Sequence, residues 1–139
     1  MENCDFCSEK IYKEQGIYEN SLIKILYPRN PVSEGHLMLI TKEHILSYDQ
    51  MNNQQVIELK DSVSNIYKKL SANYEGYNLL TNTREAAGQH IPHLHIHMFL
   101  RKKDEINSPF DILSKKVERH VIPKDIWNEN LDKFRKILG

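Results

Sequence analysis

The stretch His93-Leu94-His95-Ile96-His97-Met98-Phe99 determines how the rest of this chain is interpreted. Successive side chains of a β-strand point to opposite faces, so a strand here places the three histidines on one face and Leu94, Ile96 and Met98 on the other. The apolar face then packs on a core. Exposed strand faces usually carry Thr, Lys or Glu rather than three imidazoles. We therefore interpret the histidine face as part of a functional site.

The spacing of these histidines argues against one metal ion held by all three. On an extended strand, His93 and His97 lie about 13 Å apart at about 3.3 Å per residue. Metal–nitrogen bonds are only about 2.0–2.1 Å long. We therefore expect the roles to divide, with one end of the triplet available to a metal and the remainder free for chemistry.

Neutral imidazoles side by side suit a phosphoryl centre. With an unperturbed pKa of about 6.5, a histidine can act as nucleophile or as general acid–base, and its neighbour can hold its tautomer. Phosphoryl transfer depends mainly on positioning and charge stabilisation. Asn82 and Gln89, on the loop that enters the strand, supply uncharged donors. The chain has no Gly-x-Ser-x-Gly nucleophile motif, and the absence of Gly-x-x-x-x-Gly-Lys excludes a P-loop nucleotidase.

The flanking segments predict an α+β fold. Leu22–Tyr27 is a strand-like run that Pro28 stops, and Pro31–Gly35 has turn chemistry before the apolar run His36–Ile40, which together predict a hairpin. Tyr77–Thr81 predicts another strand. The expected architecture is an antiparallel sheet of about five strands with one long central helix and a C-terminal helix.

Two stretches have helical spacing. In the first, apolar residues recur at steps of three and four; they are Val56, Leu59, Val63, Ile66 and Leu70. Gly76 follows as the predicted stop signal. The second is Asp125–Leu138, with Asp125 as its predicted cap and with Trp127, Leu131, Phe134 and Leu138 on one stripe.

Length and charge exclude several classes of protein. The chain has 139 residues with 19 Lys+Arg and 19 Asp+Glu, which fits one domain, 1–139, and argues against a dedicated nucleic-acid binder. No apolar run approaches the roughly 20 residues of a membrane helix. The N-terminus lacks the order of a secretion signal, so we expect a cytoplasmic protein. Its two cysteines, Cys4 and Cys7, form a Cys-x-x-Cys pair that is typical of a metal site or a redox dithiol.

The chain resembles the histidine triad family of nucleotide hydrolases and transferases, whose signature is His-x-His-x-His followed by two apolar residues. The resemblance extends over the block Asn82–Arg101, with its Ala-Gly-Gln run, and over Pro31–Leu37 and Lys42–His44. Cys4–Cys7 is similar to the N-terminal motif of the zinc-carrying members. Together these motifs cover 4–101, and the extension 102–139 carries no motif that we can interpret.

The resemblance implies a homodimer that acts on a nucleotide at its α-phosphorus. It implies that His95 is the nucleophile of a nucleotidyl-histidine intermediate and that His97 contacts the phosphate. Asn82 and Gln89 match phosphate-binding positions. It also implies a structural zinc; the ligands would be Cys4, Cys7, His44 and His93.

Several positions depart from the family pattern or stay open. Pro28 stands where many members carry a residue that binds ribose hydroxyls, and Arg84 replaces a small residue, either to contact further phosphates or only to meet solvent. We expect His90 outside the site because Pro92 separates it from the strand. His36 is either a structural histidine or a neighbour of the triad, and we expect His120 at the surface.

The sequence leaves the reaction open among several functions. The substrate is a nucleoside phosphoramidate, an aminoacyl adenylate-type conjugate or a dinucleoside polyphosphate. The alternatives are a phosphorolytic nucleotidyl transferase, a nucleotide-binding regulatory module without turnover, for which Pro28 is the motivating feature, and a zinc-dependent structural adaptor.

Overall fold

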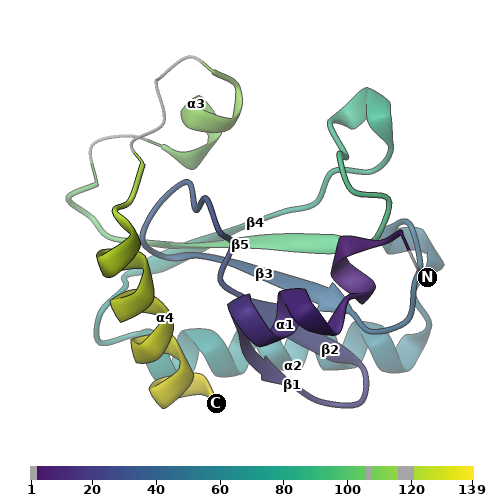
Figure 1. Ribbon diagram of the computed structural model, residues 1–139, viewed down its shortest axis with the longest axis horizontal. Helices are drawn as coiled ribbons and strands as arrows, with labels where there is room; N and C mark the ends of the chain where they lie inside the picture. The colour runs from purple at the N-terminus through teal and green to yellow at the C-terminus, as the bar shows by residue number, and fades with distance from the viewer. Residues whose placement is uncertain (1–2, 106–107, 116–120) are drawn as a thin grey trace.

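A computed structural model describes residues 3–105, 108–115 and 121–139 (Figure 1). Its strands are β1 (Gly16–Glu19), β2 (Ile23–Leu26), β3 (His36–Thr41), β4 (Gly76–Leu80) and β5 (His95–Arg101). Its helices are α1 (Glu9–Gln15), α2 (Asn53–Leu70), α3 (Pro109–Leu113) and α4 (Lys124–Leu138), and its 3-10 turns are η1 (Asp5–Cys7), η2 (Tyr48–Gln50) and η3 (Glu85–Ala87). His120 lies outside the described residues.

The strands form one antiparallel sheet in the order β1-β2-β3-β5-β4, which confirms the predicted α+β class and the predicted hairpin of β2 and β3. In Figure 1, α2 lies on one side of the sheet, whereas α3 and the η3 loop stand on the other. The sheet therefore has a helix-covered face and a face framed by loops. Among the described residues, no helix is long and apolar enough to cross a membrane.

Strand register assigns the alternating residues of β5 to these two faces. His95 pairs with Ile40 and His97 with Met38 on β3, and residues paired across antiparallel strands point to the same side. Leu94, Ile96 and Met98 belong instead to the main hydrophobic core. The predicted division of this segment into a core face and a histidine face is confirmed.

The main core joins the sheet to α2 and α4. From α2, Ile66 and Leu70 are fully buried, whereas Val56, in the first turn, is 37% exposed. From α4, Leu131 and Phe134 are buried in the same cluster. Residues near both ends of the chain therefore share one core, and the single domain over 1–139 stays a prediction.

Two predicted helix signals were wrong. Helix α2 ends at Leu70, and Gly76 is the first residue of β4 rather than the stop signal. Asp125 lies inside the first turn of α4, after the cap position Pro123, where its charge favours the helix dipole without capping a backbone N–H. The strand expected from His93 also begins two residues later, at His95. Helix α1 and strand β1, which are short, carried no periodic signal.

A close backbone approach explains the glycine before His36. A Cβ atom on Gly35 would lie 2.6 Å from the carbonyl oxygen of Leu100 and 2.7 Å from its Cβ. The carbonyl of Gly35 also accepts a hydrogen bond of 2.9 Å from the backbone N–H of Leu100. This contact fixes the turn before β3 against β5, and with it the start of the histidine face.

Gly35→Ala is expected to lower the free energy of unfolding by about 1–3 kcal/mol, because the methyl group overpacks a rigid backbone contact. Gly76→Ala is the matched control, since nothing lies within 4 Å of its Cβ position. Urea denaturation of both variants measures the difference. Equal stability of the two variants would contradict the close approach at Gly35.

Candidate functional site

A cavity of about 1280 Å³ opens over the histidine face of the sheet. His36, His95 and His97 line its floor, and Phe6 and Ile11 form part of one wall. Further lining comes from the segment after β2, from the loop around η3 and from α3; these residues include Pro28, Arg29, Asn30, Asn82, Gly88, His90, Phe110 and Leu113. The predicted chemical centre therefore lies in a cavity large enough for a nucleotide.

His95 is held so that one ring nitrogen remains free. Its Nδ1 lies 2.8 Å from the backbone carbonyl oxygen of His93. A carbonyl can only accept, so Nδ1 carries the hydrogen and donates it, and Nε2 keeps its lone pair. Burial lowers the pKa of His95, which favours the neutral imidazole. This geometry leaves the Nε2 lone pair of a neutral imidazole at the cavity floor.

His97 is fixed in the opposite tautomer through His36. The backbone N–H of Val32 donates to Nδ1 of His36 over 3.0 Å, so the hydrogen of His36 is on Nε2. His36 Nε2 lies 2.9 Å from Nδ1 of His97 and donates to it. His97 therefore carries its own hydrogen on Nε2. Of the two roles left open for His36, the structure supports a neighbour of the triad.

The two neighbouring imidazoles thus offer complementary groups, one acceptor and one donor. Their ring centroids are 5.1 Å apart. Burial, with a smaller effect of His95, lowers the pKa of His97 to about 4. Phe99 stacks beneath His97 with a 4° angle between the rings, and Phe6 meets His95 edge-on at 5.0 Å. Aromatic packing therefore restricts both rings.

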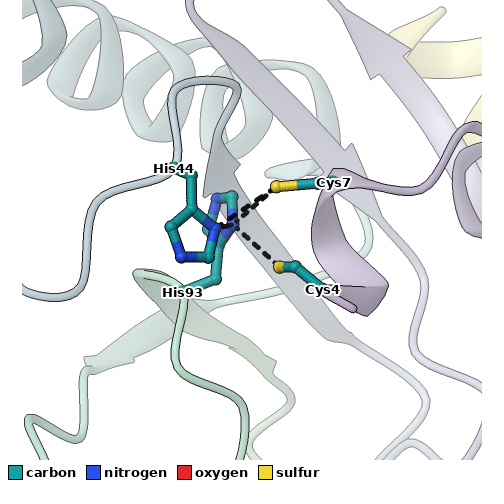
Figure 2. Close-up of side chains that lie close together, drawn as sticks. All are labelled: Cys4, Cys7, His44 and His93. Carbon is teal, nitrogen blue, oxygen red and sulfur yellow. Dashed lines mark hydrogen bonds between the residues drawn. The ribbon is translucent and has the colours of Figure 1, made fainter. Parts of the chain in front are cut away.

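A separate cluster brings together the predicted metal ligands, as Figure 2 shows. The potential ligand atoms all lie within 4.8 Å of one another; the residues are Cys4, Cys7, His44 and His93. Nδ1 of His93 lies 3.3 Å from Cys4 Sγ and 3.2 Å from Nδ1 of His44. Two sulfur and two imidazole donors in this arrangement suit a tetrahedral metal ion.

His93 is prepared for that role. Its Nε2 lies 2.6 Å from the backbone carbonyl oxygen of Thr41, to which it donates, so the lone pair of Nδ1 faces the two thiols. Burial lowers the pKa of His93 to about 4, which keeps the ring in the neutral form that a metal requires. His93 precedes β5, and this displacement from the strand allows its ring to face the cysteines.

The turn between the cysteines connects the cluster to the cavity. Lys24, which is buried on β2, donates from Nζ to the carbonyl oxygen of Phe6 over 2.7 Å. Phe6 contacts His93 as well as His95, and both Phe6 and Asp5 line the cavity. Asp5 is the only carboxylate among the described lining residues, and sequence reasoning assigned it no role. Its place inside the Cys-x-x-Cys motif was the available signal.

The loop before β5 places its polar residues differently from expectation. Asn82 lines the cavity, and its contact with phosphate stays a prediction. The amide of Gln89 instead accepts from the backbone N–H of Arg84 at 2.7 Å and donates to the carbonyl of Leu46 at 2.9 Å. A phosphate contact by Gln89 stays a prediction. His90 was expected outside the site, but it lines the cavity. The chain turns at 91–93, between His90 and β5, and this turn leaves His90 in the cavity wall.

Arg84 occupies a backbone conformation that favours glycine, with φ 69° and ψ 169°. Its backbone carbonyl accepts hydrogen bonds from the N–H groups of Ala87 and Gln89, which close the loop. Its side chain is exposed and does not line the cavity. Of the two roles considered for Arg84, the structure favours the solvated one.

Comparisons with known proteins agree with this geometry. A profile of the HIT domain matches residues 9–104. An uncharacterised HIT-like protein of Borreliella burgdorferi is 31% identical over 111 residues, covering 76% of this chain and 80% of the relative. Adenosine 5'-monophosphoramidase hnt1 of Schizosaccharomyces pombe is 27% identical over 107 residues, covering 74% and 77%. A zinc-bound histidine triad family protein of Mycobacterium smegmatis has the same fold, with a TM-score of 0.75 at 20% identity over 99% of this chain and 94% of that protein.

The hydrogen-bond pattern predicts the tautomers and the acid response of the triad. In ¹⁵N spectra at pH 7, His95 should be protonated on Nδ1 and His97 on Nε2. His97 should stay neutral until the pH falls to about 4. His36→Phe removes the donor to His97 and should release its tautomer, whereas His90→Ala should leave it unchanged.

Stability should follow the same titration. The pKa of His97 is lowered to about 4 in the folded chain, from about 6.5 in an unfolded one. As the pH falls between these values the unfolded state binds the proton first, so the free energy of unfolding should decrease. Titration of His97 near pH 6.5 in the folded protein would show that the ring is not buried as described.

Proposed function

The chain belongs to the HIT domain family, and on that premise we propose that it is a nucleotide hydrolase that cleaves at the α-phosphorus of nucleoside phosphoramidates or dinucleoside polyphosphates through a nucleotidyl intermediate on His95. The observation that carries this proposal is the pair of neutral imidazoles with opposite tautomers on the cavity floor. The name of the fission yeast relative, a monophosphoramidase, supports phosphoramidate cleavage.

The proposed reaction has two displacements. Nε2 of His95 attacks the α-phosphorus, a phosphorus–nitrogen bond forms, and the bond to the leaving group breaks with its electron pair on that group. The substituted ring is cationic, and its Nδ1–H to the His93 carbonyl stabilises that charge. Nε2–H of His97 and the amide of Asn82 donate to the phosphate oxygens. Water then displaces His95 and releases the nucleoside monophosphate.

Two alternative functions fit the same geometry, and their products distinguish them. If phosphate accepts the nucleotidyl group, the enzyme is a phosphorolytic transferase and the product is a nucleoside diphosphate. If nucleotides bind without turnover, the chain is a regulatory module. Pro28 lines the cavity, and its side chain has no group that can accept from ribose hydroxyls. We propose that the Asp5 carboxylate takes this role, which removes the feature of the sequence that motivated the module.

We propose zinc as the metal of the Cys4, Cys7, His44 and His93 cluster. Four protein ligands complete a tetrahedral set, so the ion would be structural and would hold the N-terminal turn against β5. The zinc-bound neighbour from Mycobacterium smegmatis supports this choice. Cys4 and Cys7 form no disulfide, as is typical of a reducing compartment, which supports a cytoplasmic location.

We also propose a homodimer that forms through the β4 edge of the sheet. Among the residues that the structure describes, strand β4 pairs only with β5, so its outer backbone groups are available to a second copy. Tyr77 and Leu79 on this strand are 39% and 47% exposed, which gives the edge apolar surface to bury. The balanced charge of the chain supports small nucleotides rather than nucleic acids as partners.

Metal removal tests the zinc proposal. The purified protein should contain one zinc per chain, and a chelator should lower its melting temperature by several degrees, because binding energy at such a site contributes to folding. His44→Ala should lose the metal, whereas His90→Ala, a cavity histidine outside the cluster, should retain it. Full metal content in His44→Ala would contradict the assigned ligands.

Intact-mass measurement tests the function. Wild-type protein, rapidly quenched with adenosine 5'-phosphoramidate or a dinucleoside polyphosphate, should carry one nucleotidyl group. His95→Ala should carry none and should lose on the order of 10³-fold or more in kcat. The product identifies the acceptor, since water gives the monophosphate and phosphate gives the diphosphate. An adduct that persists in His95→Ala would refute the assigned nucleophile, and binding without any turnover would favour the regulatory module.

A further inference from the structure

The side-chain amide of Gln15 is a polar group that the proposed reaction does not use. Gln15 is the last residue of α1, is only 8% exposed and lines the cavity. Its backbone carbonyl accepts from the backbone N–H of Tyr27 over 2.9 Å, but no described residue hydrogen-bonds to its side-chain amide. Buried amides almost always have a partner, because an unpaired one costs free energy. In a cavity wall, a ligand can supply that partner.

The Gln15 amide is not enclosed by protein. Among the described residues, the fully enclosed side-chain atoms without a hydrogen bond are Ser33 Oγ and Arg101 Nε. The amide atoms of Gln15 therefore keep accessible surface where Gln15 lines the cavity. Ile11 lies four residues earlier, on the same face of α1, and lines the same cavity. This face of the helix thus presents an apolar side chain followed by an amide.

The N-terminal wall leads from the chemical centre to Gln15. Phe6 meets His95 edge-on at 5.0 Å, and Ile11 packs against the hydrophobic cluster that contains Phe6. From Ile11 to Gln15 the helix rises about 6 Å, at about 1.5 Å per residue. A nucleotide with its α-phosphorus at His95 can lay its base along this apolar strip, with one edge of the base directed to Gln15.

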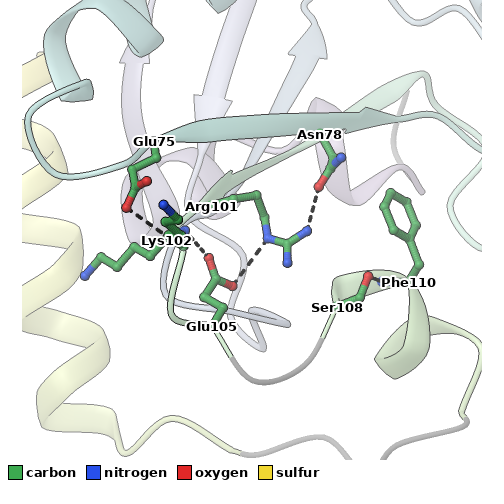
Figure 3. Close-up of polar contacts among 8 residues, drawn as sticks. Glu75, Asn78, Arg101, Lys102, Glu105, Ser108 and Phe110 are labelled. Carbon is green, nitrogen blue, oxygen red and sulfur yellow. Dashed lines mark hydrogen bonds and ion pairs between the residues drawn. The ribbon is translucent and has the colours of Figure 1, made fainter.

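Polar side chains near the opposite wall are already bonded to other residues. Figure 3 shows Arg101, at the end of β5, donating to the side chain of Asn78 at 2.8 Å and pairing with Glu105 at 3.4 Å. The hydroxyl of Ser108 accepts from the backbone N–H of Phe110 at 3.2 Å, and Phe110 lines the cavity. These polar groups are engaged around α3, unlike the amide of Gln15.

The chemistry of a carboxamide indicates which ligand edge it suits. Gln15 offers one acceptor, Oε1, beside one donor, Nε2. Adenine presents the complementary pair, an amino hydrogen at its 6-position next to a ring nitrogen that accepts. After rotation by 180°, the same amide suits guanine, which presents an oxygen at the 6-position next to N1–H. A purine without a 6-substituent has no donor on this edge and would leave Oε1 unpaired.

We propose that Gln15 recognises the 6-substituted edge of a purine base, so that the site binds 6-amino- and 6-oxopurine nucleotides more tightly than nucleotides of unsubstituted purine. This inference rests on the proposed function, since it takes the nucleotide to be bound at His95. Oε1 and Nε2 form two hydrogen bonds with the edge of the base, and Phe6 and Ile11 contact its face. The buried amide thereby gains the partner that the described protein residues do not supply.

The test compares adenosine 5'-phosphoramidate with purine riboside 5'-phosphoramidate, in which hydrogen replaces the 6-amino group. Cleavage gives kcat/KM, and calorimetry with the two corresponding monophosphates gives Kd. Gln15→Met removes the amide and keeps an unbranched side chain of similar volume. Gln54→Met is the matched control, because Gln54 is exposed on α2 and does not line the cavity.

Wild type is expected to favour the adenosine compounds by about 10-fold in kcat/KM and in Kd, as for one hydrogen bond whose loss leaves a buried oxygen unpaired. The guanosine compounds should be favoured over those of purine riboside in the same way. Gln15→Met should reduce the preference for adenosine to less than about 2-fold, whereas Gln54→Met should retain it.

A structural role of Gln15 would give a different pattern. An equal loss on both substrates in Gln15→Met, or a preference that Gln15→Met leaves unchanged, would overturn the assignment. The wild-type comparison needs no variant, so it tests the inference even where Gln15→Met does not fold, and the absence of any preference in wild type would overturn the inference.

The two readouts separate this inference from the proposed function. Cleavage of both phosphoramidates with equal kcat/KM would overturn the base recognition and leave the hydrolase intact. Selective binding of adenosine monophosphate that is lost in Gln15→Met, without cleavage of either substrate, would overturn the hydrolase and support the base recognition. Neither binding nor cleavage would overturn both.

Discussion

The arrangement of the site depends on His93. Its backbone carbonyl contacts His95 in the cavity, and its ring faces the two cysteines of the cluster. Its carbonyl oxygen accepts from Nδ1 of His95 and fixes the tautomer that leaves Nε2 free. Its ring, oriented by the carbonyl of Thr41, directs Nδ1 to the Cys4 and Cys7 thiols. Because both contacts come from one residue, a metal that orders the His93 ring would also order the backbone that holds His95.

Burial sets the chemical state of the triad. Imidazoles in a low-dielectric environment resist protonation, so the pKa values of His93, His95 and His97 are all lowered. A buried neutral imidazole still needs partners for its polar atoms, and the structure supplies them from Thr41, the His93 carbonyl and His36. These partners also select the tautomers. The same hydrogen bonds therefore satisfy the buried ring nitrogens and leave an acceptor on His95 beside a donor on His97.

Two walls of the cavity come from the N-terminal turn and from α3, whereas its floor comes from the sheet. The N-terminal wall is the turn between two cysteines, held by Lys24 and by the cluster. The other wall is α3, which Phe110 packs against Phe99. A rigid floor with separately attached walls allows substrate preference to change through the walls while the imidazole geometry stays fixed.

The sequence by itself determined the features that repeat at a local period. Alternation at 94–99 separated the core face from the histidine face, and the stripe through Ile66 and Leu70 predicted α2. The resemblance to the histidine triad family, rather than a local period, predicted the cluster of Cys4, Cys7, His44 and His93 that the structure assembles. Only the tertiary structure decided that His36 fixes His97, that His90 returns to the cavity wall, and that Asp5 and Lys115 face the same cavity. Those contacts join segments dozens of residues apart. They follow from how the chain packs, and a local periodicity in the sequence cannot predict them.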